Sequence, residues 1–161
     1  MLFRSPQFDD ITMLCLQFFG KPDELTVEAK VEKLHDVIAF VDEYLEKWDC
    51  PMSSIAQIEL AVEELFVNIA HYAYKDKEDG GTAKISIRHL GKDVEIIFTD
   101  SGTPYNPLER SDPDITLSAD DRDIGGLGIY IVKQSMNSVS YEYIGDNNVL
   151  KMRKNIQDTE D

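Results

Sequence analysis

The sequence predicts an α+β two-layer sandwich, in which helices cover one face of a mixed, mostly antiparallel sheet. Two observations predict this class. The expected elements follow the order strand, helix, helix, hairpin, helix, hairpin, and hairpins join antiparallel neighbours. The chain has 161 residues and 42% hydrophobic content, which is enough for one ordinary domain and too little for a second full one.

The first half of the chain is expected to form one strand and two helices. Residues 25–29 can form a strand, and apolar residues then recur at helical spacing through residues 31–48. Pro51 and the serines that follow it are a start signal for a longer helix, expected from about residue 53 to Tyr74. The Asp-Gly-Gly sequence at 79–81 would end that helix.

A predicted β-hairpin follows. Its strands are residues 83–90 and 94–99, and the Gly-Lys-Asp sequence at 91–93 joins them as a short turn. Residues 108–124 show no periodicity and are rich in Asp, Ser and Pro, which indicates a long loop. Loops of this length in compact domains are usually functional lids or disordered segments.

A third helix and a second hairpin are expected to close the fold. The helix spans residues 127–136, and the strands are residues 139–143 and 149–152. The polar tail, residues 156–161, is expected to be frayed.

Charge and cysteine content argue against several classes of function. The formal net charge is -15, from 16 Lys+Arg against 31 Asp+Glu, so the clustered cations that bind a nucleic-acid backbone are not expected. Cys15 and Cys50 form no CxxC motif, and both are expected to be small buried apolar residues. No apolar run is long enough for a membrane span and no signal segment is recognised, so a cytoplasmic protein without membrane contact is expected.

The first candidate functional block is Glu64-Leu65-Phe66-Val67-Asn68 on the long helix. Glu64 and Asn68 are one turn apart and share a face. Mg²⁺ prefers hard oxygen ligands and keeps most of its waters, so the amide oxygen of Asn68 together with ATP phosphate oxygens would suit it. Glu64 could act as general base on the attacking hydroxyl or water. Both residues would equally fit ordinary solvent-facing helix positions.

The second block is Asp100-Ser101-Gly102-Thr103-Pro104, which follows a predicted strand. The carboxylate of Asp100 can accept a hydrogen bond from the exocyclic amine of adenine and would repel the carbonyl of guanine. Gly102 would let the backbone turn close to a flat ligand. The alternative is an ordinary turn, because all of these are turn residues.

The third block is Gly125-Gly126-Leu127-Gly128, at the start of a predicted helix. The first amides of a helix have no partners within it, and together with the positive helix end they bind phosphate. The block is not a P-loop, because the chain has no GxxxxGK sequence, and a Rossmann fingerprint is not expected because its third glycine is missing. The alternative is a glycine-rich cap on the helix.

In this order, the three blocks resemble the GHKL ATPase superfamily, which includes gyrase-type topoisomerases, heat-shock chaperones, histidine kinases and mismatch-repair ATPases. The block 64–68 matches its N-box, 100–102 its first glycine box and 126–128 its second. The resemblance covers roughly residues 24–155 and implies one ATP-binding domain over that range.

The resemblance also implies a role for each matched residue. Asn68 would hold Mg²⁺, Glu64 would be the catalytic base and Asp100 would read adenine. The remaining matched residues would line the nucleotide: Gly102, Gly126, Leu127 and Gly128.

Within this superfamily the chain is similar to the anti-sigma-factor serine/threonine kinases. The similarity lies in Asn-Ile-Ala-His-Tyr-Ala-Tyr at 68–74, in Asp-Ser-Gly-Thr-Pro-Tyr-Asn-Pro at 100–107 and in the second glycine box. It implies a Mg-ATP-dependent kinase that phosphorylates a Ser or Thr of a STAS-domain anti-sigma antagonist and binds a sigma factor. A homodimer, the family's usual state, is a further expectation.

By the same resemblance, residues 108–124 would form an ATP lid. Such kinases often place a basic residue directly before the second glycine box, but Ile124 precedes the glycines here. Arg110 and Arg122 stand among several acidic residues, and Arg122 is the candidate for contact with the γ-phosphate. A lid this acidic would close poorly, or only over phosphates that Mg²⁺ has neutralised.

The start of the chain has a second resemblance. Ile11 to Phe18 is apolar and β-rich, and Gly20-Lys21-Pro22 separates it from the rest. The sequence Gln-Phe-Asp-Asp-Ile-Thr-Met-Leu at 7–14 resembles the end of a PP2C-type serine phosphatase domain. Residues 1–20 would then be an incomplete tail of such a domain, and the chain the carboxy-terminal piece of a larger phosphatase-kinase protein. A plain amino-terminal strand is the alternative.

Two other functions stay open. One is a nucleotide-binding docking module that has lost phosphotransfer and regulates an attached phosphatase. The other is a histidine-kinase catalytic domain, because His35-Asp36 faintly resembles a phosphoacceptor box. That box lacks its following Pro, and one predicted helix precedes the ATP blocks where a dimerisation hairpin needs two. A surface histidine is the simpler interpretation, and His71 is given no catalytic role.

Overall fold

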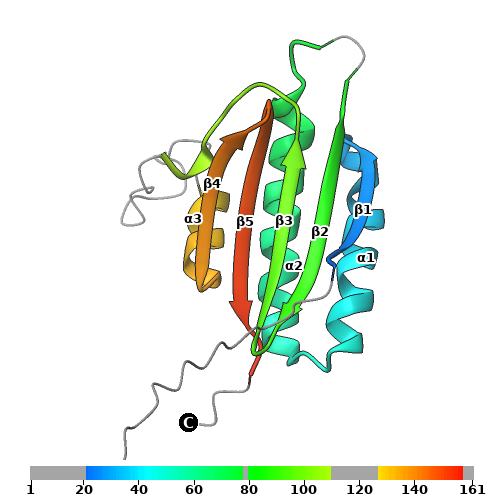
Figure 1. Cartoon of the computed structure of the whole chain (residues 1–161), viewed down its shortest axis with the longest axis vertical. Helices are drawn as coiled ribbons and strands as arrows, with labels where there is room; N and C mark the ends of the chain where they lie inside the picture. The colour runs from blue at the N-terminus through cyan, green and yellow to red at the C-terminus, as the bar shows by residue number, and fades with distance from the viewer. Residues whose placement is uncertain (1–20, 78–79, 110–126, 158–161) are drawn as a thin grey trace, which may run out of the picture.

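The computed structural model describes residues 21–77, 80–109 and 127–157, which form a five-stranded sheet with helices on one of its faces (Figure 1). The strands are β1 (Asp23–Glu28), β2 (Thr82–Leu90), β3 (Asp93–Asp100), β4 (Ser138–Ile144) and β5 (Asn147–Asn155). Their order across the sheet is β1-β2-β3-β5-β4. The predicted class is confirmed, although the described strands pair antiparallel throughout and the sheet is not mixed.

In the described part of the chain, three α-helices form the second layer behind the sheet (Figure 1). They are α1 (Leu34–Lys47), α2 (Met52–Asn68) and α3 (Leu127–Ser135). Three short turns of other helix types accompany them: the 3₁₀ turns η1 (Val31–Lys33) and η3 (Pro107–Glu109), and the π-helical turn η2 (Ile69–Ala73). The long helix predicted from residue 53 to Tyr74 is therefore present, but its last turn widens from α to π geometry.

The core lies between the two layers, as the apolar periods require. In β3, Val94, Ile96 and Phe98 are buried at every second position, which is the strand period. The helices contribute buried residues at helical spacing, namely Val37, Val41 and Leu45 of α1 and Ile58, Ala61, Val62, Leu65 and Phe66 of α2. Cys50 joins this core, as predicted.

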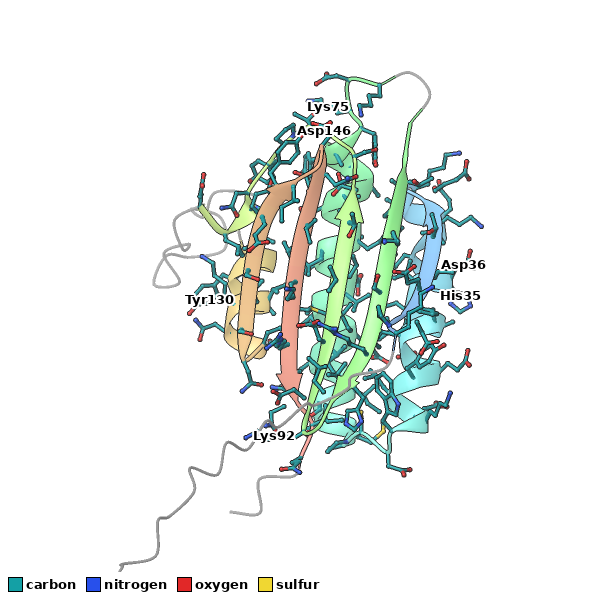
Figure 2. The ribbon with its side chains drawn as sticks, viewed as in Figure 1. His35, Asp36, Lys75, Lys92, Tyr130 and Asp146 are labelled. Atoms are coloured by element: carbon teal, nitrogen blue, oxygen red, sulfur yellow. The ribbon has the colours of Figure 1, made fainter. Side chains whose placement is uncertain are left out.

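Both predicted hairpins are present, and their turns contain residues with positive φ. Gly91 has φ 70° between β2 and β3, and Gly145 and Asp146 have φ 56° and 61° between β4 and β5. Figure 2 shows Lys92 and Asp146 at opposite ends of the sheet. The two turns thus favour one register for β2 with β3 and one for β4 with β5.

The opposite face of the sheet carries a buried charge. The side chain of Glu95 on β3 has 0% exposure. It accepts hydrogen bonds from Arg88 Nε at 2.7 Å and from Arg153 Nε at 2.6 Å. Arg88 and Arg153 are its partners in register on β2 and β5, so a carboxylate between two arginines links the three central strands.

Several predicted features lie outside the described residues. These are the amino-terminal segment 1–20 with Cys15, the frayed tail beyond residue 157, and residues 110–126 of the predicted lid and glycine block. Within the described ranges, no helix is long and apolar enough to cross a membrane.

Candidate functional site

A cavity of about 460 Å³ lies between the helical layer and one end of the sheet. Its volume falls within the roughly 300–1,000 Å³ typical of small-molecule sites. The lining includes five residues that the sequence argument selected: Glu64, Asn68, Asp100, Leu127 and Gly128. The three sequence blocks, far apart along the chain, therefore contribute to one cavity.

Glu64 and Asn68 line the cavity from α2, one helical turn apart. Both side chains are half-buried, because the neighbouring Leu65 and Phe66 point into the core and hold this face of the helix toward α3. This placement supports the shared face inferred from the spacing. His71, in contrast, is exposed and contacts the ring of Tyr72 edge-on.

The start of α3 lies directly against Glu64. A Cβ added to Gly128 would overlap the carboxylate of Glu64, so position 128 tolerates only glycine while Glu64 keeps this conformation. Leu127, the first residue of α3, is 46% exposed at the edge of the cavity. Gly126 and Arg122, the other predicted nucleotide contacts on this side, lie outside the described residues.

Asp100 is the last residue of β3, and its side chain is buried. Its Oδ1 accepts the backbone N–H of Gly102 at 2.9 Å and the side-chain amide of Asn148 at 2.8 Å. Burial raises the pKa of Asp100, and these two donors and the charge of Lys77 oppose that shift. A buried carboxylate that lines a cavity can accept a hydrogen bond from a ligand amine.

Asn148 is the main site residue that sequence reasoning missed. It is buried, lines the cavity and is the register partner of Asp100 on β5. Its Oδ1 accepts Tyr141 O–H at 2.7 Å and the backbone N–H of Tyr105 at 3.2 Å. The Asn-Asn pair at 147–148 reads as turn sequence, so it gave no local signal.

Gly102 has a packing role that the sequence did not predict. It is buried, does not line the cavity, and a Cβ there would overlap the carbonyl oxygen of Ala73. The N–H of Thr103 donates to that same carbonyl at 2.8 Å. Gly102 therefore permits close approach of the turn after β3 to the end of the π-helical turn. Its contact with a nucleotide stays a prediction.

Tyr74 fastens the same helix end to the sheet. Its hydroxyl donates to Thr82 O at 2.7 Å and accepts the N–H of Ser101 at 2.9 Å. Its ring occupies the space that a Cβ on Gly81 would need. These contacts set the position of Asp100 relative to α2, because Ser101 follows Asp100 directly.

The donor set fits a magnesium nucleotide better than a free metal ion. Within the described ranges, no group of three or more His, Cys, Asp or Glu side chains could hold a metal. The charged residues among those that line the cavity, Glu64 and Asp100, are both acidic. A cation here would need ligands from outside the protein, such as phosphate oxygens, and a phosphate would need a cation to offset the acidic surroundings.

Comparison with known families decides the class of the domain. Residues 27–154 match the model of the histidine kinase-like ATPase domain. The chain belongs to this family. Histidine kinase-like ATPase domains bind nucleotides, so membership assigns nucleotide binding to the domain.

Individual relatives point to kinases. Serine-protein kinase RsbW of Halalkalibacterium halodurans is 31% identical over 126 residues, which cover 72% of each chain. Serine/threonine-protein kinase BtrW of Bordetella bronchiseptica is 25% identical over 83 residues, 52% of this chain and 58% of the relative. The chain therefore spans less than two thirds of the BtrW relative.

A solved structure supports the fold. The crystal structure of the RsbU and RsbW domains of a Mycobacterium tuberculosis protein aligns with a TM-score of 0.62 at 15% identity. The alignment covers 85% of this chain and 33% of that chain. An antiparallel five-stranded sheet with helices on one side is thus shared between this histidine kinase-like ATPase domain and a solved structure.

Proposed function

We propose that the chain is a Mg-ATP-dependent protein serine/threonine kinase of the anti-sigma type. The observation that carries this proposal is the convergence of Glu64, Asn68, Asp100 and Gly128 on one cavity. The RsbW and BtrW relatives, which are named as serine or serine/threonine kinases, support the reaction class. The acceptor would be a Ser or Thr of a STAS-domain anti-sigma antagonist, and the binding partner a sigma factor.

Each lining residue has a chemical part in this proposal. The amide oxygen of Asn68 holds Mg²⁺, and Mg²⁺ when bound offsets the charge of the phosphates. Glu64, one turn earlier, accepts the proton of the attacking hydroxyl. Asp100 accepts a hydrogen bond from the exocyclic amine of adenine, which a guanine base would not offer at that position. Backbone amides around Gly126 and Gly128 receive phosphate oxygens.

The start of α3 is a favourable place for the carboxylate that serves as base. A carboxylate close to the first turn of a helix is stabilised by the positive end of the helix dipole. Glu64 lies beside the start of α3, where its carboxylate can receive the proton of the attacking hydroxyl. Arg122 contacts the γ-phosphate in this proposal, so Arg122→Ala should weaken ATP binding or slow transfer; unchanged values for both would reject that contact.

The test is transfer of label from Mg-ATP to candidate STAS-domain proteins, followed by analysis for acid-stable phosphoserine or phosphothreonine. Asn68→Ala and Glu64→Ala should abolish transfer. Glu63→Ala is the matched control, because Glu63 is the exposed neighbour of Glu64 on α2 and should leave transfer intact. Asp100→Asn should weaken ATP binding by about 1–3 kcal/mol.

The same experiment separates the alternatives. Acid-labile label would favour a histidine-kinase domain, and ATP binding without label on any protein would favour a docking module. The first alternative loses weight from the position of His35, which Figure 2 shows on the outer side of α1, across the molecule from Tyr130 of α3. A cytoplasmic location, a homodimer and residues 1–20 as the incomplete tail of a PP2C-type phosphatase domain remain parts of the proposal.

A further inference from the structure

A line of hydrogen bonds crosses three strands toward Asp100. Tyr141 on β4 donates its hydroxyl proton to Asn148 Oδ1 at 2.7 Å. Asn148 on β5 donates from Nδ2 to Asp100 Oδ1 at 2.8 Å. All three residues line the cavity, so the line runs along its sheet-side wall.

The direction of this line is fixed by the backbone. Asn148 Oδ1 also accepts the N–H of Tyr105 at 3.2 Å, and Nδ2 also donates to the carbonyl of Thr103 at 3.2 Å. A backbone N–H can only donate and a carbonyl can only accept, so the amide of Asn148 cannot be turned over without losing both bonds. The NH₂ group of Asn148 must therefore face Asp100.

The line leaves one oxygen of Asp100 for a ligand. In the described part of the chain, Asp100 Oδ1 receives two donors, from Asn148 and from the backbone of Gly102. Further donors in the cavity would then meet Oδ2. The two donors that converge on Oδ1 stabilise the charged form of the side chain, so they oppose the upward pKa shift that burial causes in Asp100.

We propose that Tyr141 and Asn148 are positioning residues that hold Asp100 as a hydrogen-bond acceptor and thereby set the preference of the site for adenine, whose amine is at C6, over guanine, which has a carbonyl there. This proposal rests on the proposed nucleotide site and adds what keeps its base-reading carboxylate ionised and oriented. The segment 103–105 is bound by the same amide, so the edge of the cavity and the carboxylate are positioned together.

The titration of Asp100 is the readout that a purely structural role would not change. Burial raises the pKa of Asp100, and the amide of Asn148 is the first of the groups that oppose it. Without that amide the same burial acts with less opposition, so the carboxylate should bind a proton at higher pH. A ligand amine would then lose its acceptor over a wider pH range.

The test follows Asp100 by carbon NMR of ¹³C-labelled aspartate in the whole, nucleotide-free chain. Asn148→Asp and Asn148→Leu should move the Asp100 midpoint to higher pH, and Tyr141→Phe should move it in the same direction by less. Tyr143→Phe is the matched control, since Tyr143 lies on the same strand, is 45% exposed and does not line the cavity. The Asp100 midpoint in Tyr143→Phe should equal that of the wild type.

Binding of ATP and GTP is then measured across pH by calorimetry. At a pH between the wild-type and variant midpoints, Asn148→Leu should bind ATP about tenfold more weakly. The ratio of ATP to GTP affinity should fall with it. An Asp100 midpoint that stays at the wild-type value in every folded variant would overturn the proposal. Tyr141→Phe removes only one hydroxyl, so at least this variant is expected to fold.

The two proposals fail in different ways. A wild-type chain that binds no ATP rejects the nucleotide site, while the NMR titration still decides whether Asn148 controls Asp100. ATP binding with unchanged titration and unchanged base preference in Asn148→Asp rejects the positioning role alone.

Discussion

The carboxylate of Glu64 on α2 lies against the backbone of Gly128 on α3, with no room between them for a methyl group. The two helices are packed together, and both residues line the cavity. The carboxylate of Glu64, the proposed base, thus occupies the space that a side chain at position 128 would need. A side chain at the second position of α3 would therefore displace the Glu64 carboxylate from the place that it has here.

Gly128→Ala should therefore be harmful although alanine favours helices. In an exposed helix interior the exchange stabilises by about 0.5–1 kcal/mol. Here the new methyl group would displace the Glu64 carboxylate, which offsets that gain, so we expect a stability change of less than about 1 kcal/mol and at least about a tenfold loss in phosphotransfer. Thermal unfolding and single-turnover transfer from labelled ATP measure the two effects.

Removing the clashing partner provides the control. In the double variant Glu64→Ala with Gly128→Ala, the steric conflict is gone, so stability should be at least that of Gly128→Ala while transfer stays lost. Gln134→Ala, an exposed substitution on the same helix, should change neither. A Gly128→Ala protein that is both more stable and fully active would show that Glu64 is free to move.

Gly102→Ala tests the contact between the turn after β3 and the helix end. The added Cβ would overlap the carbonyl oxygen of Ala73, and a backbone atom cannot move aside as a side chain can. We expect a loss of about 1–3 kcal/mol in denaturant unfolding, together with weaker ATP binding because Asp100 shifts with the turn. Ser101→Ala should cost much less, because the Ser101 hydroxyl lies 3.4 Å from the Tyr74 hydroxyl, at the limit of a hydrogen bond. Equal stabilities of the two variants would contradict this account.

Local patterns account for the part of the molecule that was predicted correctly. The helical period of α1 and the alternation in β3 specify which face of each element is buried, and a two-layer fold satisfies both at once. The spacing of Glu64 and Asn68 predicted a shared face for the same reason. Such features depend on neighbours within four residues, so one sequence is enough to see them.

The missed features depend on pairing between distant segments. Asn148 meets Asp100 only because β5 pairs with β3 in one register, and a shift by one residue would turn Asn148 to the other face. The role of Gly102 likewise depends on Ala73, which a separate element brings to it. Tyr74 appeared in a family motif, but its bonds to Thr82 and Ser101 follow from the packed sheet alone.

Glu95 should make stability sensitive to acid. Burial raises the pKa of Glu95. Hydrogen bonds and charges from Arg153 and Arg88 lower it by more than burial raises it, so the net shift is downward. A carboxyl with a depressed pKa stabilises the fold above its ordinary value of 4.5 and loses that contribution as the pH falls through its folded value. Glu95→Gln should therefore cost about 1–3 kcal/mol at pH 7 and much less in acid, as measured by urea unfolding at several pH values. Glu142→Gln, on exposed β4, is the control; a Glu95→Gln penalty that is the same at all pH values would refute the linkage.

Asp42 should make the fold less stable as the pH rises, which is the opposite of the effect of Glu95. Burial raises its pKa to about 6, with further contributions from Glu59 on α2 and from Glu46 one turn along α1. Its Oδ1 is buried without a hydrogen-bond partner among the described residues. Because the folded pKa lies above the ordinary 3.8, the native state binds more protons than the unfolded state between these values, and stability falls as the pH rises toward 6.

Asp42→Asn should remove this penalty. The amide keeps the shape of the protonated acid and carries no charge, so we expect a gain of about 1–2 kcal/mol at pH 7.5 and almost none at pH 4. The gain is smaller than the free energy that corresponds to the whole pKa shift, because Asp42 is half-buried and solvent screens the repulsion. Glu43→Gln, an exposed change of the same kind on α1, should show no such pH dependence. Urea unfolding at the two pH values measures the gain. An Asp42→Asn protein that is no more stable than the wild type at pH 7.5 would mean that solvent already screens the charge of Asp42.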